Sequence, residues 1–540
     1  MNLSLSDRLG RARLCVGLMM TCAATVQAFE LVAGPPVQRF EVQGNSLLPP
    51  SLIEQTLAAY KGSTSLKQMR DAAAAVQQLY REAGYGAVVA FLPEQGLADG
   101  VLRVRVVEGR LERIDITDNQ HFTRENILAS LPALRIGEAL QVRRIDAQIQ
   151  MANESPAKAV QVLLQPGGKA GSVAAKVTVV EVPVQRFSLR ADNTGDARTG
   201  RGRVGLGWQH GDVWGRDHVL SLDAQTSVEK PSRVAAFSAG YRVPFYAQAM
   251  ALDAYTAYSD VDAGRSDTAA GELAFAGRGR ITGLRVSSYL PRLGNMDQRL
   301  ILGLERRDYL NQCSIEGLPQ GACGSAGASV SSQPLSVSYT GQMAGEYRLG
   351  FSIGLLHNLG IGGSHASAAD FEAIRPGARQ RYTMLRIAAS GSFGLGETGL
   401  GLSLRGSGQA ASGPLIPGEQ MGIGGAQSVR AYAEREVSGD AGGQLSVELL
   451  SPNGAESLFG LSGGETRGLL FADAGWVERR QGESCMVGRG SRCRLGGAGA
   501  GLRFGARGLQ LRLDLARAFV TGPQTQRGDY RLHFGMNYSF

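Results

Sequence analysis

Alternating apolar and polar residues dominate the second part of the chain, from residue 184 to the carboxyl terminus. Side chains of an extended strand point to opposite faces with a period of two. In the clearest case one face is all leucine and the other is mostly polar: Leu509, Leu511, Leu513 and Leu515 against Gln510, Arg512, Asp514 and Ala516. Charged residues opposite a leucine row suit a water-filled lumen better than a dry core. Alternation alone would also fit a soluble β-sandwich or propeller, so a further signal has to decide.

The last ten residues supply that signal. Their apolar face ends on an aromatic carboxyl terminus: Leu532, Phe534, Met536, Tyr538 and Phe540. Such a strand would promote aggregation at the edge of a soluble sheet, but not where lipid covers the face and a neighbouring strand closes the edge. We therefore predict that residues 184–540 form a transmembrane antiparallel β-barrel, with room for about sixteen strands at roughly 22 residues each.

Residues 35–183 differ, because helical periods alternate there with short strands. The order strand, helix, helix, strand, strand occurs twice, so two α+β modules of about 75 residues each are expected, at 35–109 and 110–183. In the first module we expect strands at 38–42, 88–92 and 101–107 and helices at 51–59 and 65–83. In the second we expect strands at 111–117, 159–164 and 174–182, one helix from residue 123 and another at 142–152.

Residues 1–28 are predicted to be a secretory signal peptide. Arg8, Arg11 and Arg13 precede a short apolar stretch, and Val26-Gln27-Ala28 provides small residues for cleavage. After Ala28 no apolar run reaches the length of a membrane-spanning helix. The mature chain is therefore expected to be exported from the cytoplasm and to enter a membrane only as strands.

Composition and cysteine usage restrict the chemistry. The formal net charge is +8, with no dense basic tract, so nucleic-acid binding is not expected. Two of the six cysteines lie in the signal peptide, and the others form two close pairs that predict loop disulfides, Cys313–Cys323 and Cys485–Cys493. A zinc site would need tighter cysteine spacing.

Catalytic motifs are weak or absent. The Gly-Leu-Ser-Gly-Gly stretch at 460–464 fits a nucleophile-elbow pattern, but it lacks a strand-to-helix context in a chain with 74 glycines. The six histidines show no paired spacing, and there is no Walker A loop. We expect neither an enzyme, nor a metal site, nor a cofactor.

Four stretches give the chain a resemblance to a known family. They are Ala83-Gly84-Tyr85 with Leu92-Pro93-Glu94-Gln95, Asp99-Gly100 and Val107-Glu108-Gly109; Asp192-Asn193-Thr194-Gly195 leading to Gly215-Arg216-Asp217; Gly424 to Tyr432; and Phe471-Ala472-Asp473-Ala474-Gly475. In this order they resemble the outer-membrane translocators of two-partner secretion, which export and activate hemolysins and filamentous hemagglutinins. The resemblance implies a signal peptide, two polypeptide-transport-associated (POTRA) domains and a sixteen-stranded barrel.

The third and fourth stretches imply a mechanism. Val429, Arg430, Ala431 and Tyr432 resemble the family's Val-Arg-Gly-Tyr signature, at the tip of a loop that folds into the barrel, here around residues 420–440. Phe471, Asp473 and Gly475 resemble its Phe-x-Asp-x-Gly motif on the inner wall. The resemblance implies that Arg430 pairs with Asp473, since a guanidinium and a carboxylate can anchor a loop bidentately. The alternative from the residues alone is that both charges face lumen water.

This sequence departs from the family pattern at two places. Ala431 stands where the family usually has Gly; if the position needs a positive φ, alanine costs about 1 kcal/mol. Only Phe29 to about Gly34 separates the cleavage site from the first module, so we expect no plug helix and expect the folded loop to be the main obstruction.

The resemblance implies a monomeric translocator in the outer membrane of a Gram-negative bacterium, with its modules in the periplasm. Its partners would be a secreted exoprotein, membrane lipid and, during biogenesis, the barrel-assembly machinery, for which Phe534, Tyr538 and Phe540 would be the carboxyl-terminal signal. Two other functions stay open. A barrel-assembly insertase usually has more modules than the two found here, and a porin-type channel would need none.

Overall fold

The fold is described from a computed structural model. It covers residues 35–540, except 170, 198, 261–263, 269, 270, 276, 277, 311–327, 346 and 456–462. The predicted signal peptide, the stretch 29–34 discussed for a plug helix and the pair Cys313–Cys323 lie outside these residues. Within them, no helix combines the length and the apolar character that crossing a membrane would demand.

The first α+β domain has the predicted order of elements: β1 (Arg39–Gln43), α1 (Pro50–Ala58), α2 (Leu66–Glu82), β2 (Val88–Phe91) and β3 (Val101–Glu108). Its sheet has the order β1-β3-β2, with β1 parallel to β3, so β2 is an edge strand. Val37, Met69 of α2 and Leu102 of β3 form part of its core.

The second α+β domain repeats this order with β4 (Arg110–Thr117), α3 (Arg124–Ser130), α4 (Val142–Ala152), β5 (Lys158–Pro166) and β6 (Ser172–Glu181). The sheet order β4-β6-β5 matches the first domain. Helix α3 begins where Thr123 accepts a hydrogen bond from the Asn126 N–H, a side-chain N-cap. Ile127, Ile145 and Val177 belong to the core between its helices and sheet.

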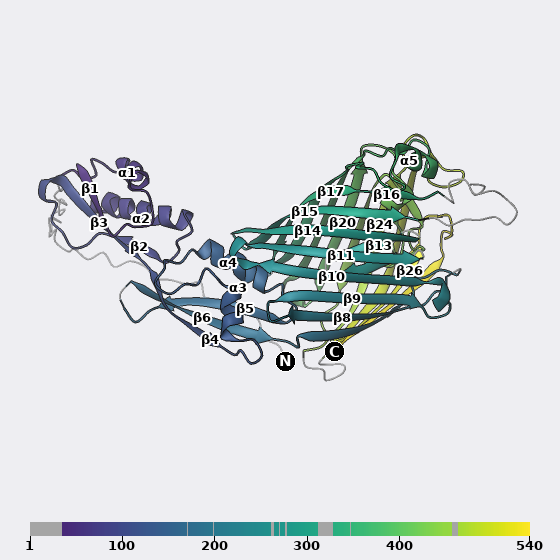
Figure 1. Ribbon diagram of the computed structural model, residues 1–540, viewed down its shortest axis with the longest axis horizontal. Coiled ribbons are helices and arrows are strands. Elements are labelled where there is room, and N and C mark those ends of the chain that lie inside the picture. Colours follow the sequence, from purple (N-terminus) through teal and green to yellow (C-terminus); the bar gives the residue numbers. More distant parts are fainter. Residues whose placement is uncertain are drawn as a thin grey trace, which may run out of the picture. The chain divides into compact units, whose positions relative to one another are not determined.

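The remaining strands form one closed barrel (Figure 1). In chain order they are β7 (Gln185–Asp192), β8 (Arg203–Val213), β9 (His218–Ser227), β10 (Ala235–Phe245), β11 (Met250–Asp260), β14 (Arg278–Leu293), β15 (Met296–Tyr309), β16 (Val330–Ser332), β17 (Pro334–Met343), β18 (Tyr347–Asn358), β19 (Thr383–Gly394), β20 (Gly401–Ala411), β23 (Ala441–Leu450), β24 (Glu465–Glu478), β25 (Arg492–Ala506), β26 (Leu509–Ala518) and β27 (Tyr530–Ser539). Since β16 and β17 both pair with β15 and are separated only by Gln333, the described part of the barrel has sixteen strands. The predicted fold class is confirmed.

The barrel closes where the last strand meets the first. β27 pairs antiparallel with β7, from Gly535 opposite Asp192 to Ser539 opposite Ser188. Beyond this ladder, Phe187 and Phe540 exchange two backbone hydrogen bonds and their rings stack. The aromatic ending therefore completes the seam, and an edge strand is avoided.

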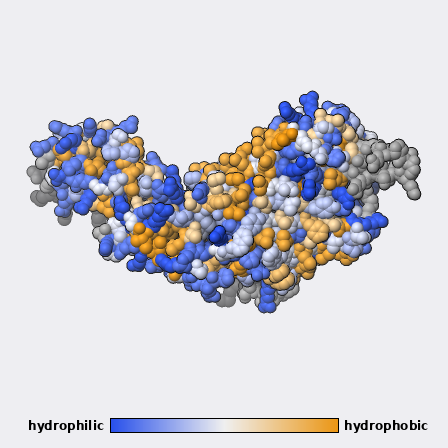
Figure 2. All heavy atoms as spheres, viewed as in Figure 1, coloured by the Kyte–Doolittle hydropathy of each residue, from blue (hydrophilic) through white to orange (hydrophobic). Residues whose placement is uncertain are grey.

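The two faces of the wall differ as the alternation predicted. On β26, Leu513 and Leu515 are exposed on the outside, whereas Asp514 and Ala516 are buried on the lumen side. Phe534, Tyr538 and Phe540 likewise point outward, and His533 points inward. Figure 2 shows hydrophobic residues over much of the visible outer surface of the strands. Such a wall suits contact with hydrocarbon outside and water or polar side chains inside.

Connections at the two ends of the barrel differ in length. The end next to the second α+β domain, here the near end, has short turns such as residues 214–217 and 507–508. Longer connections at the far end include α5 (Ala368–Ile374), the hairpin β12 (Gly264–Thr268) with β13 (Gly271–Phe275), and a connection containing β21 (Met421–Ile423) and β22 (Val437–Gly439). The last of these carries the candidate site.

Candidate functional site

The connection from β20 to β23, residues 412–440, folds back into the barrel. Its two limbs pair as β21 and β22, with Ile423 opposite Val437, so the segment between them is held as a hairpin. Gly425 has φ +103 there, and a side-chain Cβ at this position would lie 2.1 Å from Glu434 Oε2. Only glycine fits this turn.

The predicted loop motif is the most buried part of this hairpin. Val429, Arg430, Ala431 and Tyr432 are each at most 1% exposed. An arginine rarely reaches this burial without compensating partners. Oppositely charged partners are therefore expected close to the Arg430 guanidinium.

The wall opposite the hairpin is β24. Leu469, Phe471, Asp473, Gly475 and Val477 point inward, whereas Leu470 and Trp476 between them are exposed on the outside. Gly475 lets the loop approach this wall, because a Cβ there would lie 3.2 Å from both Ile423 Cδ1 and Val429 Cγ2. The Phe-x-Asp-x-Gly residues thus form the surface on which the loop tip packs.

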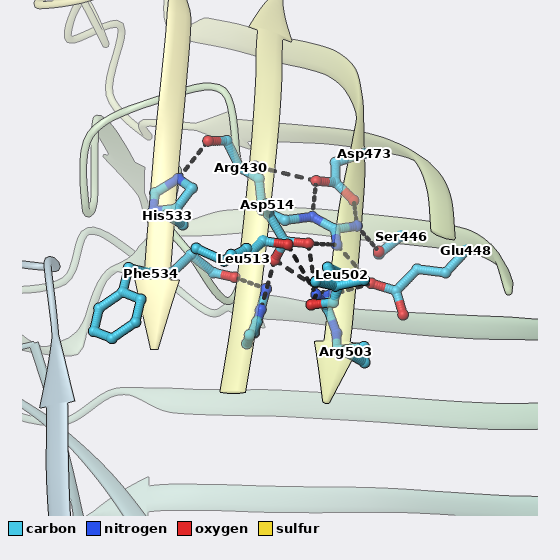
Figure 3. Close-up of polar contacts among 12 residues, drawn as sticks. Arg430, Ser446, Glu448, Asp473, Leu502, Arg503, Leu513, Asp514, His533 and Phe534 are labelled. Carbon is cyan, nitrogen blue, oxygen red and sulfur yellow. Dashed lines mark hydrogen bonds and ion pairs between the residues drawn. The ribbon is translucent and has the colours of Figure 1, made fainter. Parts of the chain in front are cut away.

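The Arg430 guanidinium forms a bidentate ion pair with Asp473. Nε donates to Oδ2 and Nη2 donates to Oδ1, each at 2.7 Å, and the Arg430 backbone N–H also donates to Oδ2 at 3.1 Å (Figure 3). The guanidinium carbon lies 3.5 Å from the centre of the Phe471 ring, close enough for a cation–π contact. Backbone, charge and ring therefore fix one orientation of this side chain.

Two further carboxylates complete the surroundings of Arg430. Nη1 donates to Glu448 Oε1 at 2.5 Å and lies 3.8 Å from Asp514 Oδ1, and Nη2 donates to Ser446 Oγ at 3.0 Å. These carboxylates also contact other arginines: Arg405 and Arg503 lie near Glu448, and Arg503 and Arg512 bind Asp514. We call this set of four arginines and three carboxylates the lock cluster. Because opposite charges alternate through it, no single buried charge is left uncompensated.

Residues on both sides of Arg430 add directional contacts. The Tyr432 hydroxyl lies within hydrogen-bond distance of the carbonyl oxygens of Gly496 and Val520, 2.9 and 2.8 Å away, and its oxygen accepts a hydrogen bond from the Val520 N–H. His533 of β27 donates a hydrogen bond from Nε2 to the Arg430 carbonyl oxygen. The loop tip is thereby tied to β24, β25 and β27.

The backbone of Ala431 does not adopt the positive φ that would make alanine unfavourable at this position. The described non-glycine residues with positive φ do not include Ala431. Its methyl group packs on β25, where a Cβ at Gly497 would lie only 2.7 Å from it. The small residue needed for this approach is thus on the wall.

Three buried acids that the sequence reasoning missed anchor the loop away from its tip. Glu419 accepts hydrogen bonds from Arg307 (2.6 Å), Tyr309 (3.0 Å) and Ser332 (3.0 Å). Glu436 accepts from the N–H groups of Gln524 and Thr525.

Asp440 is the third of these acids. It binds Arg375 bidentately and accepts from the N–H groups of Leu415 and Arg480. Burial raises the pKa of Asp440, but the Arg375 guanidinium and the two N–H groups outweigh it and hold the pKa below its usual value. Asp440 thereby joins three far-end connections.

No periodic signal marks these acids, since they lie in non-repeating segments and their partners are up to 112 positions away. Their spacing in the sequence from the Arg430 motif does not indicate an anchoring role either.

The cysteine pair Cys485–Cys493 forms a disulfide at the far end, which joins the connection after β24 to Cys493 in β25. Among the residues the structure describes, no group of three or more His, Cys, Asp or Glu side chains could hold a metal ion.

Two family models match parts of this chain. The model of a family described as haemolysin secretion/activation protein ShlB/FhaC/HecB matches residues 172–504, and that of a POTRA domain of the ShlB type matches residues 36–109. The outer membrane transporter CdiB of Escherichia coli O6:K15:H31 is 27% identical over 485 residues, 86% of this chain and 76% of the relative.

Two solved structures share the fold. CdiB from Escherichia coli matches with a TM-score of 0.74 at 21% identity, covering 96% of this chain and 93% of the other. CdiB from Acinetobacter baumannii matches with a TM-score of 0.69 at 18% identity, covering 94% and 90%.

Proposed function

The chain belongs to the haemolysin secretion/activation family of ShlB, FhaC and HecB, and we propose that it exports an unfolded exoprotein through its barrel without ATP. It is an outer-membrane transporter of the two-partner secretion type, with its POTRA domains in the periplasm. The single observation that carries the finer proposal is the lock cluster. It anchors a loop that obstructs the lumen by contacts that can break and re-form without covalent chemistry.

We propose that transport begins at the edge of the first POTRA domain. Strand β2 has a neighbour on one side only, and its Val89 and Phe91 side chains are 51% and 40% exposed. An extended segment of the exoprotein can add a strand there and place alternate side chains against these two residues. Capture in this mode needs an unfolded substrate, since a folded one offers no free strand.

We propose that the loop tip then leaves β24 and the exoprotein threads past it. Water entering the lumen rehydrates Arg430 and Asp473 as they separate, which lowers the cost of breaking the pair. Folding of the exoprotein outside the cell prevents its return and supplies the free energy, so no nucleotide is needed. In this scheme the chain acts as a monomer and carries out no catalytic step.

We also propose that Phe534, Tyr538 and Phe540 serve as the signal by which the barrel-assembly machinery inserts the chain. Their exposure on the outer face of the last strand makes them available before the seam with β7 closes.

A secretion assay tests the export proposal. Cells would produce the exoprotein, sought first at the neighbouring gene, with the wild-type chain, without it, or with a Phe91→Glu variant. Leu52→Glu on α1 is the matched control, because Leu52 is also 40% exposed. We expect exoprotein in the medium only with the wild type and the control. Equal amounts without the chain would refute export, and equal amounts with Phe91→Glu would refute capture at β2.

A further inference from the structure

The near-end turn between β8 and β9 holds its residues in an unusual backbone. Trp214 and Asp217 both have positive φ, 59° and 58°, a backbone conformation that strains a non-glycine residue. Such strain persists only where neighbours over-determine it.

Those neighbours come largely from the second POTRA domain. Asp217 forms an ion pair with Lys158, whose Nζ lies 2.8 Å from the carboxylate, and accepts a hydrogen bond of 2.8 Å from the Tyr246 hydroxyl. Asn126 Nδ2 donates a hydrogen bond of 2.9 Å to the Gly215 carbonyl oxygen. Trp214 is 77% exposed, and Arg216 is exposed as well.

Trp214 does not stand alone on the outer face. Its ring makes edge contacts with His218 and Tyr241, each with ring centres 6.1 Å apart, and His218 Nδ1 is hydrogen-bonded to Tyr241 Oη at 2.7 Å. Tyr241 lies opposite Leu220 in the ladder, on the same side of the wall as the exposed Leu222. Aromatic side chains with polar tips are typical of the membrane–water interface.

A groove of about 650 Å³ runs along the outer wall from Tyr241 of this aromatic cluster to Arg306 and Ile361, toward the far end of the barrel. Tyr241 belongs both to the aromatic cluster and to the groove. Leu284 and Leu304 border the groove. The floor of the groove is made of small side chains on β10, β11 and β14: Ala239, Ala254, Thr256 and Thr282. Thr256 and Thr282 bond to each other through their hydroxyls at 3.1 Å, which lessens the cost of facing hydrocarbon.

We propose that this region binds one phospholipid of the periplasmic leaflet. The phosphate would contact Arg216, the aromatic cluster would hold the glycerol region, and an acyl chain would lie in the groove. The charge of Arg216 favours this occupant, as does the continuity of the groove with the lipid-facing wall of an outer-membrane barrel. Since the same turn holds Lys158 through Asp217, the lipid is placed directly beside the attachment of the second POTRA domain.

Tryptophan fluorescence tests the headgroup part. The chain has three tryptophans, so Trp208→Phe with Trp476→Phe leaves Trp214 as the only reporter. In nanodiscs of phosphatidylethanolamine, Trp214 emission should be quenched strongly by a lipid brominated near the headgroup and weakly by aqueous acrylamide. The reverse order would overturn the proposal.

Native mass spectrometry from the same nanodiscs tests specific retention. One phospholipid should stay bound to the full chain, and Arg216→Gln should weaken retention about tenfold, the effect of losing one charge-assisted hydrogen bond. Arg507→Gln, in the near-end turn between β25 and β26, is the matched control. Equal retention in the two variants would overturn the phosphate contact, as would displacement by inorganic phosphate alone.

A second pair of variants tests the groove. Ala254→Phe fills its floor and should abolish retention, whereas Ala474→Phe on the outer face of β24 should not. Both positions face lipid, so neither change should prevent barrel folding, which heat-modified electrophoretic mobility would verify. Retention unaffected by Ala254→Phe would contradict the proposed acyl-chain site.

Discussion

At the residue scale, Arg430 combines near-complete burial with contacts to three carboxylates. Burying a lone guanidinium would be prohibitive, and even a single buried pair often gains little over apolar packing. The benefit of such a cluster is orientation, since a planar donor group held by two oxygens has one favourable geometry. The cluster therefore specifies where the loop tip lies more than it stabilises the barrel.

Exchanging the two charges tests this contact. Arg430→Asp leaves Asp473 facing a like charge, so the loop tip loses the one position that the lock cluster specifies; we expect export to be lost while the barrel stays folded. Adding Asp473→Arg should restore part of the export, because the pair can re-form with reversed polarity. Secretion of the exoprotein measures both variants. Full export by the single Arg430→Asp variant would show that the contact is not needed.

Glu419 leads to a different prediction, because it anchors the entry of the loop and not its tip. Glu419→Gln keeps the shape but removes the charge that faces Arg307, which lies 2.6 Å away. Breaking a buried pair on one side costs about 3–5 kcal/mol. We expect faster proteolysis at residues 412–420 and a higher resting conductance in planar bilayers. Conductance equal to the wild type would contradict an anchoring role.

The sequence identified only part of the site at this scale. Arg430 and Asp473 were named through a resemblance, and their side chains are in contact, but the export role assigned to them stays a proposal. Glu419, Glu436 and Asp440 could not be found in the same way. An isolated acid in an irregular segment has no period, and its partner depends on the closed barrel.

At the element scale, alternation predicted most strands well because each faces lipid on one side and the lumen on the other. Helix α4 begins and ends at the predicted residues, 142 and 152, since its apolar face packs on the sheet of its own domain. Helix α5 and the pairings of β12 with β13 and β21 with β22 were missed. These short elements are set by local caps or by the surrounding barrel, as with Ser367, which caps α5 in a capping box with Asp370.

A buried ion pair joins strand β5 to the turn after β8. Lys158 and Asp217 form an ion pair in which both side chains are almost fully buried, and burial lowers the pKa of Lys158 despite the attraction of Asp217. Lys158→Met or Asp217→Asn alone should each cost about 3–5 kcal/mol, because an unpaired buried charge remains.

The double variant completes this cycle. It should cost clearly less than the sum of the single changes, since no buried charge is left. Chemical unfolding in detergent, followed at the second α+β domain, measures all three variants. Additive losses would show that the pair is not coupled.

At the scale of the whole molecule, a closed barrel encloses one long loop that is bound at its entry, tip and exit. The wall is held by continuous ladders from β7 to β27, whereas the loop is held to the wall mainly by side-chain contacts. Motion during transport is therefore expected in the loop first. We propose that the tip must leave β24 before an exoprotein can pass.

A reversible covalent tether tests this claim most directly. Val429 packs on Gly475, so Val429→Cys with Gly475→Cys would join the loop tip to the wall when oxidised. Export of the exoprotein would be measured before and after reduction, beside the wild-type chain treated identically. We expect the oxidised variant to export nothing and the reduced variant to recover. Undiminished export through the tethered barrel would contradict the account.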